Sequence, residues 1–469
     1  MGSRQIDKQS SQRLHHQPIE KKHRNLKLLW LGLGGVGIIS AVAGTLLAFS
    51  LTSARLQQRP LSSQDTAFFN PDGKQVFDRN ALQIPEVTKP VNILVLGIKT
   101  NLSDLKNSDG SQRKKTGYDA EIDSLDGLSD TMMLLRFDPQ SQRIVVFGIP
   151  RDTRIERPKY GVEKINAVDK ESGVTVAAQA VSKVLGGVPI DRYIRVNNIG
   201  VNKLIDGLGG VNVTIPKDIK YQDDAQHFYV NLKAGKQHLD GQGLMNFLRY
   251  RHDANGDIGR MQRQQVVMQS LTEQALNPMN VARIPQLLSI VKSHIDTNLT
   301  GEEILALGGF SLHTGKSKMQ MLLMPGDYNG NGKHGVSFWL PDSRSIQNMM
   351  ARYFGRGTIT SESIKAENVR INIQDTTYFP DATKRLIKKL HQAGYQNVQI
   401  DTLKLKEDLA TSQIIAQKGN PQVAEGLTQA LGFGDIKVET SGHIYSDLTI
   451  KLGRDWIQKE QEYSSSKKQ

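Results

Sequence analysis

The segment LSDTMMLLRFDPQSQRIVVFGIPRDTRI, residues 128–155, predicts a β-hairpin with charged groups at its open end. Two apolar runs of strand length, TMMLLRF and RIVVFGI, are separated by DPQSQ, and Asp, Pro and Ser favour turns. The apolar runs are expected to lie in a core. The polar LSD before the first run and the PRDTR after the second therefore predict a polar site beside that core.

The predicted register of this hairpin places opposite charges side by side. Pairing Phe137 with Arg143 around the turn puts Asp130 beside Arg151 and the proline that precedes it. Arg154 follows three residues later. One carboxylate and two guanidiniums are therefore expected at the same end of the hairpin.

Length and composition restrict the class of protein. The chain has 469 residues, 38% of them hydrophobic, which is enough for more than one domain with its own core. It contains no cysteine, which excludes disulfides and thiolate metal sites. The formal net charge is +13, and a positive surplus suits anionic ligands and surfaces.

The N-terminal residues predict a membrane anchor. Residues 28–51 form an apolar run of 24 residues without a charge, long enough to span a bilayer. Residues 1–27 carry seven Lys or Arg against Asp7 and Glu20, an excess that keeps this tail in the cytoplasm beside anionic lipid head groups. A cleaved signal peptide is the alternative, but the run is longer than a signal core and no clear cleavage site follows it. We expect a single-pass protein of the cytoplasmic membrane whose other domains are extracytoplasmic.

The exterior part divides into two predicted α/β domains. Residues 52–90 are polar with scattered Pro and Gly and predict a linker. Strands alternate with helices over residues 91–350, the pattern of an α/β domain. Residues 366–456 predict the order strand, helix, strand, strand, helix, strand, strand, a smaller α/β domain without a catalytic constellation. Residues 457–469 are polar and predict a disordered tail.

Basic and amide side chains recur along the first domain and suit a phosphate ligand. They are Arg151, Arg154, Lys164, Arg249, Arg251, Arg260, Arg263 and Gln264. Guanidinium groups favour phosphate because their planar forks donate two parallel hydrogen bonds and stay protonated. Several such groups around one point fit a pyrophosphate. A solvated basic face with incidental ion pairs is the alternative, and the composition leaves both open.

Spacing along the predicted helices refines this set. Arg260, Arg263 and Gln264 share one face of a helix and occupy its first turns, where free amides favour an anion. Arg249 and Arg251 would point about 200° apart on an ideal helix. They converge only if the helix has ended, which the turn-rich HDANGD segment after them predicts.

The ordered motifs of the first domain resemble a known family. The segments LSDTMMLLRFDP, FGIPRDTRI, EKIN, IDRYIRV, LIDGLGGVNVTIP and LDGQGLMNFLRYRHDANGDIGRMQRQQ are similar to those of the LytR-CpsA-Psr (LCP) family of envelope-polymer transferases. The resemblance covers residues 91 to about 280, and the motifs follow one another there in order. Residues 366–456 look like the LytR C-terminal domain, and the short tail with one membrane helix fits the family layout.

The resemblance implies a fold and an activity. The fold would be an LCP-type central mixed β-sheet flanked by helices, followed by a small C-terminal α/β domain. The activity would be a phosphotransferase reaction of the LCP type, with pyrophosphatase as a possible side activity. The enzyme would move a polyprenyl-pyrophosphate-linked glycan onto peptidoglycan or a similar envelope acceptor. The lipid would lie in an apolar pocket between sheet and helices, with Mg²⁺ and arginines holding the pyrophosphate at its mouth.

The resemblance also assigns individual residues. Asp130 matches a magnesium-binding, catalytic carboxylate, Arg151 matches a catalytic arginine that binds phosphate, and Arg154 matches the second arginine of that motif. The remaining head-group ligands would be Lys164, Arg249, Arg251, Arg260 and Gln264.

Two positions depart from the family pattern. Lys99 stands where the family usually has a second magnesium-binding Asp, and Leu128 stands where it often has Arg. A protonated lysine cannot ligate a metal but can neutralise a phosphate. We therefore count Lys99 among the pyrophosphate-binding residues and expect a weaker dependence on Mg²⁺.

Two other functions are compatible with parts of the sequence. A non-catalytic envelope receptor for polyprenyl phosphates is the alternative that Lys99 motivates. A DNA-binding regulator would suit the positive charge, but the predicted topology leaves only a short tail in the cytoplasm. We therefore expect no nucleic-acid partner.

Overall fold

The computed structural model describes most of the chain between residues 61 and 459. The described residues are 61–69, 77–78, 86–99, 125, 127–215, 217–224, 228–250, separate positions within 263–290, 294–314, 318–328, 337–359, 365–377, 379, 381–401, 409–418, 420–439, 442–443 and 446–459. Among them, no helix is both long and apolar enough to cross a membrane. The anchor predicted at residues 28–51 lies outside the described residues.

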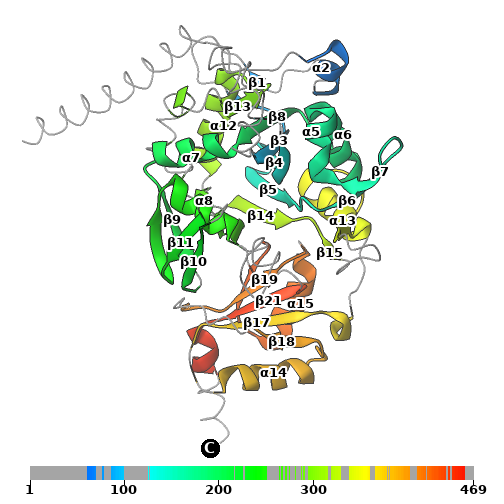
Figure 1. The fold of residues 1–469 in the computed structure, drawn as a ribbon. Coiled ribbons are helices and arrows are strands. Elements are labelled where there is room, and N and C mark those ends of the chain that lie inside the picture. The colour runs from blue at the N-terminus through cyan, green and yellow to red at the C-terminus, as the bar shows by residue number, and fades with distance from the viewer. Residues whose placement is uncertain are drawn as a thin grey trace, which may run out of the picture. The chain divides into compact units, whose positions relative to one another are not determined.

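A mixed six-stranded sheet forms the centre of the first domain (Figure 1). Its strands, in spatial order, are β13 (Ile295–Thr297), β8 (Arg192–Asn197), β3 (Val91–Lys99), β4 (Leu128–Asp138), β5 (Arg143–Ile149) and β14 (Met319–Leu323). The pairs β3–β8 and β5–β14 are parallel, and the other pairs are antiparallel. The predicted mixed sheet and the β4–β5 hairpin are confirmed.

The register of the hairpin differs by one residue from the prediction. Phe137 pairs with Ile144, and Arg143 pairs instead with Asp138. The shift comes from the turn, where Asp138 Oδ1 accepts hydrogen bonds from the backbone N–H groups of Gln140 (3.0 Å) and Ser141 (3.3 Å). An Asp side chain that binds its own turn in this way closes the loop directly after itself.

Apolar side chains cover both faces of the sheet, because successive residues of a strand point to opposite sides. On one face, Leu94, Leu134 and Phe147 pack with helices α6 (Val174–Val184) and α13 (Ser343–Phe354). On the other face, residues such as Ile93 and Ile144 pack with α12 (Gly301–Thr314). Figure 1 shows α6 and α12 on opposite sides of strands β3 to β5.

The folded domain begins before residue 91. Helix α2 (Ser63–Phe69) lies within the segment predicted as a linker, and it places the ring of Phe69 5.1 Å from that of Tyr193 in the core. Two short strands, β1 (Phe77–Asp78) and β2 (Glu86–Val87), pair before the central sheet.

Four strands and two helices form a second cluster in the first domain. The elements are α7 (Asn198–Gly207), β9 (Val211–Ile215), β10 (Ile219–Asp223), β11 (Phe228–Leu232), β12 (Gly235–Leu239) and α8 (Gly241–Arg249). Strand β9 pairs with β12 and β10 with β11, in two separate two-stranded sheets. Their apolar residues share one core, including Val213, Val230 and Phe247.

The C-terminal domain follows the predicted order of elements. They are β17 (Ile371–Asp375), α14 (Ala382–Gln392), β18 (Val398–Ile400), β19 (Gln413–Ala416), α15 (Pro421–Leu431), β20 (Asp435–Lys437) and β21 (Leu448–Leu452), preceded by the short η6 (Ala366–Asn368). The five strands form a mixed sheet in the order β18-β17-β21-β19-β20. Helices α14 and α15 share a core with one face of this sheet, built from residues such as Ile373, Leu386 and Leu427.

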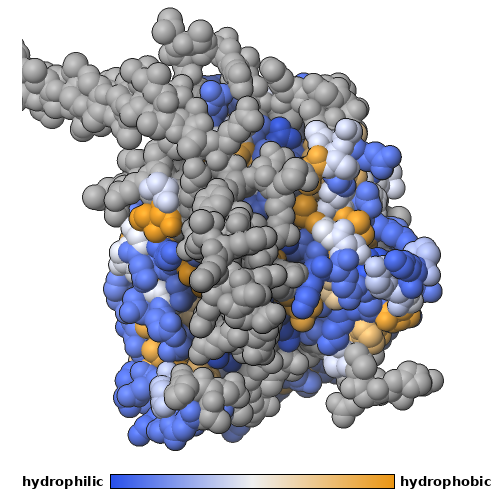
Figure 2. All heavy atoms as spheres, turned by 45° about the horizontal axis from the view of Figure 1, so that its top comes forward, coloured by the Kyte–Doolittle hydropathy of each residue, from blue (hydrophilic) through white to orange (hydrophobic). Residues whose placement is uncertain are grey.

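On the face shown in Figure 2, most of the described side chains are hydrophilic, with hydrophobic ones in patches between them. Among the exposed large hydrophobic residues are Leu128, Tyr160 and Val162. Isolated exposed hydrophobic residues are normal for a folded domain and do not themselves mark a site.

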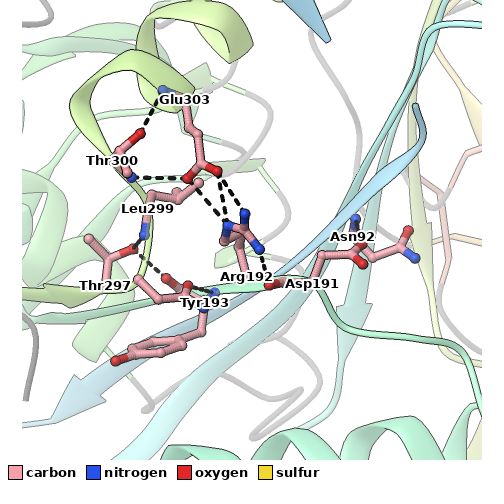
Figure 3. A network of polar contacts seen from close by, with 9 residues as sticks. Asn92, Asp191, Arg192, Tyr193, Thr297, Leu299, Thr300 and Glu303 are labelled. Atoms are coloured by element: carbon pink, nitrogen blue, oxygen red, sulfur yellow. Dashed lines mark hydrogen bonds and ion pairs between the residues drawn. The ribbon is translucent and has the colours of Figure 1, made fainter. Parts of the chain in front are cut away.

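A polar network fixes α12 (Gly301–Thr314) against the sheet (Figure 3). Glu303 accepts hydrogen bonds from Arg192 Nε (3.2 Å) and Nη2 (2.7 Å). The same carboxylate accepts a bond from the backbone N–H of Thr300, whose hydroxyl accepts one from the N–H of Glu303. This reciprocal pair is a capping box, so Glu303 both starts the helix and joins it to β8.

Replacing Glu303 should therefore destabilise the domain more than replacing its exposed neighbour. We expect Glu303→Ala to lower the free energy of unfolding by about 3 kcal/mol, because it leaves the half-buried Arg192 without its partner. Thr300→Ala should cost about 1 kcal/mol as the loss of a cap. The measurement is urea denaturation, with Glu302→Ala as the matched control. Equal losses for the two glutamates would contradict this role of Glu303.

Candidate functional site

Asp130 and Arg151 form an ion pair where the hairpin opens. Arg151 Nη1 donates to Asp130 Oδ1 at 2.7 Å, and the two side chains are 17% and 25% exposed. The β4–β5 ladder ends at the pair Met132–Ile149, and the same register extended by two residues sets Asp130 opposite Arg151. The predicted meeting of these charges is therefore confirmed, with the corrected register.

A β-bulge directs Asp130 out of the ladder between β3 and β4. Gly97 pairs with Thr131 and Ile98 pairs with Ser129, so Asp130 has no partner on β3. Such an extra residue leaves the regular pleat, and bulges of this kind re-aim side chains beside functional sites. The bulge thus frees Asp130 to meet a residue that follows β5.

The chain after β5 is held in a tight turn. The N–H of Thr153 donates to the carbonyl of Pro150 at 3.0 Å, and the N–H of Asn166 donates to the carbonyl of Arg151 at 3.3 Å. The N–H of Ile165 also donates to the carbonyl of Thr153 at 2.9 Å. These backbone bonds fix the position from which the side chain of Arg151 leaves.

Asp152 is a site residue that the sequence prediction missed. Its carboxylate contacts Lys164 Nζ at 2.9 Å and Arg151 Nε at 3.6 Å, and its side chain is only 5% exposed. Its backbone carbonyl accepts a bond from the N–H of Trp339 in β16 (Trp339–Pro341), which pairs with β15 (Gly326–Tyr328). The sequence signal that could have identified Asp152 is its position between the two arginines of the PRDTR motif.

The hairpin of β6 and β7 presents two more cations. In the pairing of β6 (Arg154–Arg157) with β7 (Gly161–Lys164), Arg154 lies directly opposite Lys164. Directly opposed residues project from the same face of a hairpin. Arg154 is exposed, whereas Lys164 is held by Asp152. The following η3 (Ile165–Ala167) and α5 (Val168–Ser172) lead into α6.

Only part of the second predicted group of cations lies among the described residues. Arg249 is exposed at the end of α8, and its guanidinium lies 4.8 Å from the ring centre of Phe228. Helix α8 ends at Arg249 and Tyr250 is extended, which is the geometry under which Arg249 and Arg251 were expected to converge. Arg251 and Arg260 lie outside the described residues.

Gln264 and Arg263 occupy different environments although they are neighbours. Gln264 is helical and half-buried. Arg263 is buried, donates to the carbonyl of Tyr250 and lies 5.4 Å from the centre of that ring. The interpretation of Arg263 as part of an exposed anion-binding face is wrong, because its guanidinium packs on Tyr250.

Lys99 and the ion pair lie at the same edge of the sheet. Strand β3 ends at Lys99, and β5, which runs in the same direction, ends two residues before Arg151. Lys99 is exposed and pairs with Leu128 at the start of β4. The carboxyl ends of sheet strands are the usual location of ligand sites in α/β folds.

An apolar surface runs along one face of the sheet toward this edge. Val95, Leu135, Ile194 and Met319 are half-buried on the face that packs with α12. Gly97 continues this face, and a Cβ atom at that position would lie 3.0 Å from the Cβ atom of Thr131. This strip leads to the sheet edge at which β3 and β5 end, where Lys99 continues the same side of β3.

The carboxylates present suit only a limited metal site. No group of three or more His, Asp or Glu in the described part of the chain is arranged to hold a metal. Asp130 and Asp152 both contact Arg151, and Asp130 is the more exposed of the two. Mg²⁺ often uses one or two carboxylates and takes its other ligands from water and substrate phosphates, a requirement that Asp130 fits.

This chain belongs to the LytR_cpsA_psr family, whose model matches residues 54–354. Residues 368–456 match a second family model, described as the LytR cell envelope-related transcriptional attenuator. The two matched segments correspond to the two α/β domains. The resemblance noted in the ordered sequence motifs is confirmed.

Individual relatives match part of this chain. The regulatory protein MsrR of Staphylococcus aureus is 30% identical over 200 residues, which are 42% of this chain and 59% of MsrR. TagU of Bacillus cereus, named a polyisoprenyl-teichoic acid–peptidoglycan teichoic acid transferase, is 29% identical over 284 residues, or 59% of this chain and 80% of TagU. The crystal structure of B. subtilis TagV is 24% identical and covers 58% of this chain and 99% of that chain, with a TM-score of 0.46.

Because Asp152 is buried, replacing it should destabilise the protein more than replacing an exposed acid whose ion pair has a similar length. Asp152→Asn should lower the free energy of unfolding by about 2 kcal/mol, because a charged hydrogen bond is weakened inside the fold. Asp218 provides a matched control, since it contacts Lys233 at 3.0 Å with side chains that are 60% and 77% exposed. Asp218→Asn should change stability by about 0.5 kcal/mol or less. Urea denaturation tests this, and equal effects would refute a structural role for Asp152.

Proposed function

We propose that this protein is a membrane-anchored phosphotransferase that moves a polyprenyl-pyrophosphate-linked glycan onto peptidoglycan or a similar envelope acceptor. The observation that carries the proposal is the position of Arg151, which Asp130 and Asp152 hold at the sheet edge where β3 and β5 end. Family membership and the transferase name of TagU support the same reaction class.

The cation cluster supplies what phosphoryl transfer requires. That reaction depends mainly on positioning and on neutralising charge on the phosphate oxygens. Arg151, Arg154 and Lys164 would bind the pyrophosphate, and Asp152 would keep two of these cations in place before the substrate arrives. Groups fixed in advance need little rearrangement in the transition state, which is the source of their catalytic effect.

The proposed reaction needs no reactant other than the lipid-linked glycan and the acceptor. The acceptor hydroxyl attacks the glycan-bearing phosphorus, and its proton passes to solvent water as the new P–O bond forms. The bond from that phosphorus to the bridging oxygen breaks, and polyprenyl phosphate departs with the electron pair. Arg151 and Lys164 neutralise the charge that accumulates on the departing phosphate, while the polyprenyl chain lies along the strip near Val95, Leu135 and Ile194.

A magnesium ion would add to this neutralisation. Asp130 is the residue that would hold the ion, together with water and phosphate oxygens. Bound Mg²⁺ supplies positive charge to the phosphate oxygens. Lys99 at the same sheet edge would replace part of that charge with a side chain of the protein itself.

A non-catalytic polyprenyl-phosphate receptor is the second candidate, and Lys99 is the observation that favours it. An exposed lysine at the end of β3 suits binding of a phosphate but leaves Asp130 with one fewer carboxylate for metal binding. Turnover separates the two candidates. A purified protein that binds lipid pyrophosphate and releases no product with any divalent metal is a receptor.

Arg151→Ala should lower transfer by about 100-fold or more, since one fixed donor to developing charge is lost. The matched control is Arg143→Ala at the other end of the same hairpin, where the guanidinium lies 5.9 Å from the ring centre of Tyr353. Its transfer rate should remain close to that of the wild type. The assay follows radiolabelled glycan from polyprenyl pyrophosphate to acceptor, beside a thermal melt of each variant. A folded Arg151→Ala protein with normal turnover would show that the proposed site is wrong.

Lys99 is expected to set the magnesium requirement. Lys99→Asp should make binding of lipid pyrophosphate depend steeply on Mg²⁺, because a positive group is replaced by a carboxylate ligand. Lys99→Ala should weaken binding at all magnesium concentrations. The measurement is a magnesium titration of lipid-pyrophosphate binding by the wild type and both variants. Superimposable curves would exclude a role for Lys99.

A further inference from the structure

A polar pocket lies within the C-terminal domain. Its volume is about 630 Å³, and its lining includes β17, the edge strand β18 and the segments before each of them. Five lining residues carry carboxamide side chains, namely Asn368, Asn372, Gln396, Asn397 and Gln399. A carboxamide both donates and accepts hydrogen bonds, so this lining matches a ligand that carries both kinds of group.

One side of the pocket lies on the face of the sheet opposite the core shared with the helices. Ile371 and Ile373 of β17 belong to the core shared with α14 and α15, so Asn372 between them projects to the other face. Asn372 is in register with Gln399 of β18 and with Thr449 of β21. Three neighbouring strands thus present polar side chains in one row.

Hydrogen bonds fix the wall beside this row. The hydroxyl of Thr449 accepts bonds from Gln417 Nε2 and from the backbone N–H of His443, both at 2.9 Å. The hydroxyl of Ser446 lies 2.9 Å from that of Thr449 and donates to the carbonyl of His443 at 2.8 Å. His443 and Ser446 line the pocket, so part of its surface is rigid before a ligand binds.

The side-chain oxygen of Asn372 is buried without a hydrogen-bond partner. Asn372 is only 3% exposed, and its Oδ1 atom accepts no bond from the described part of the chain. An unsatisfied acceptor of this kind destabilises a fold by about 1–3 kcal/mol, so it normally has a partner. A ligand with a donor group would supply that partner.

The arginine of the lining is paired with a carboxylate. Arg370 contacts both oxygens of Asp447 at 3.3 Å, and Lys418 contacts the same carboxylate at 3.0 Å. Burial alone would raise the pKa of Asp447, but Lys418 and Arg370 hold it below its usual value. The arginine in the lining therefore already has an ionised partner.

We propose that this pocket binds a neutral glycan rich in hydroxyl and acetamido groups, such as the N-acetylated amino-sugar backbone of the cell wall. Hydroxyl and acetamido groups both donate and accept, as the carboxamides of the lining do. The C-terminal domain would hold the glycan by itself, separately from the transfer site. This binding does not depend on catalysis by Arg151.

The test is calorimetric titration of the full chain in detergent micelles with the tetrasaccharide of N-acetylglucosamine. The wild type should bind it, and Asn372→Leu should weaken binding by about tenfold or more, because a buried polar contact is lost. The same substitution should leave the melting temperature equal or higher, since it removes an unsatisfied acceptor. Gln374→Leu is the matched control. Gln374 is also buried with an unpartnered Oε1 but does not line the pocket, so this variant should bind normally.

Two further titrations distinguish glycan binding at this pocket from binding at the transfer site and from binding of peptide. Arg151→Ala should bind the tetrasaccharide like the wild type, so a failed transfer site and a failed glycan site give different results. A peptide of the wall-stem type should not bind. Absence of tetrasaccharide binding, equal binding by Asn372→Leu and the wild type, or binding of the peptide alone would overturn the proposal.

Discussion

The ion pair between Asp130 and Arg151 is the contact on which the candidate site depends. It exists because a bulge in β4 removes Asp130 from the ladder and because the β4–β5 register brings Arg151 opposite to it. The pair also connects the site to the core, since both strands continue into buried residues such as Leu134 and Phe147.

Polar networks hold the sheet on several sides. On the face with α6, buried Arg195 joins Asp169 of α5 to Asp296 of β13 at 3.0 Å each. Burial alone would lower the pKa of Arg195, but these two carboxylates raise it, so the guanidinium remains charged within the fold. Arg195 also donates to the carbonyl of Leu125, three residues before β4. The strand that carries Asp130 is thus fixed at its start.

Much of the architecture could be predicted because its signals are local. Two apolar runs of strand length around a turn segment identified β4 and β5. The order of elements in the C-terminal domain was also predicted in full. The hairpin register was missed because it depends on two hydrogen bonds within the turn. Helix α2 was missed because a polar helix of seven residues gives no periodic signal.

The sequence predicted which types of residue form the site, but only part of their arrangement. Sequence showed that Arg151 and Asp130 would meet, since both flank one hairpin. It missed Asp152, whose role depends on the fold of β6 and β7 bringing Lys164 back to it. It also misjudged Arg263, because the spacing along a helix does not show which face lies against Tyr250.

The most direct test of the central claim is a crystal structure of this protein with geranyl pyrophosphate. We expect the phosphate oxygens to lie within hydrogen-bonding distance of Arg151 and Lys164, with the prenyl chain along Val95, Leu135 and Ile194. A pyrophosphate bound elsewhere, with the Asp130–Arg151 pair unchanged and the apolar strip empty, would contradict the account.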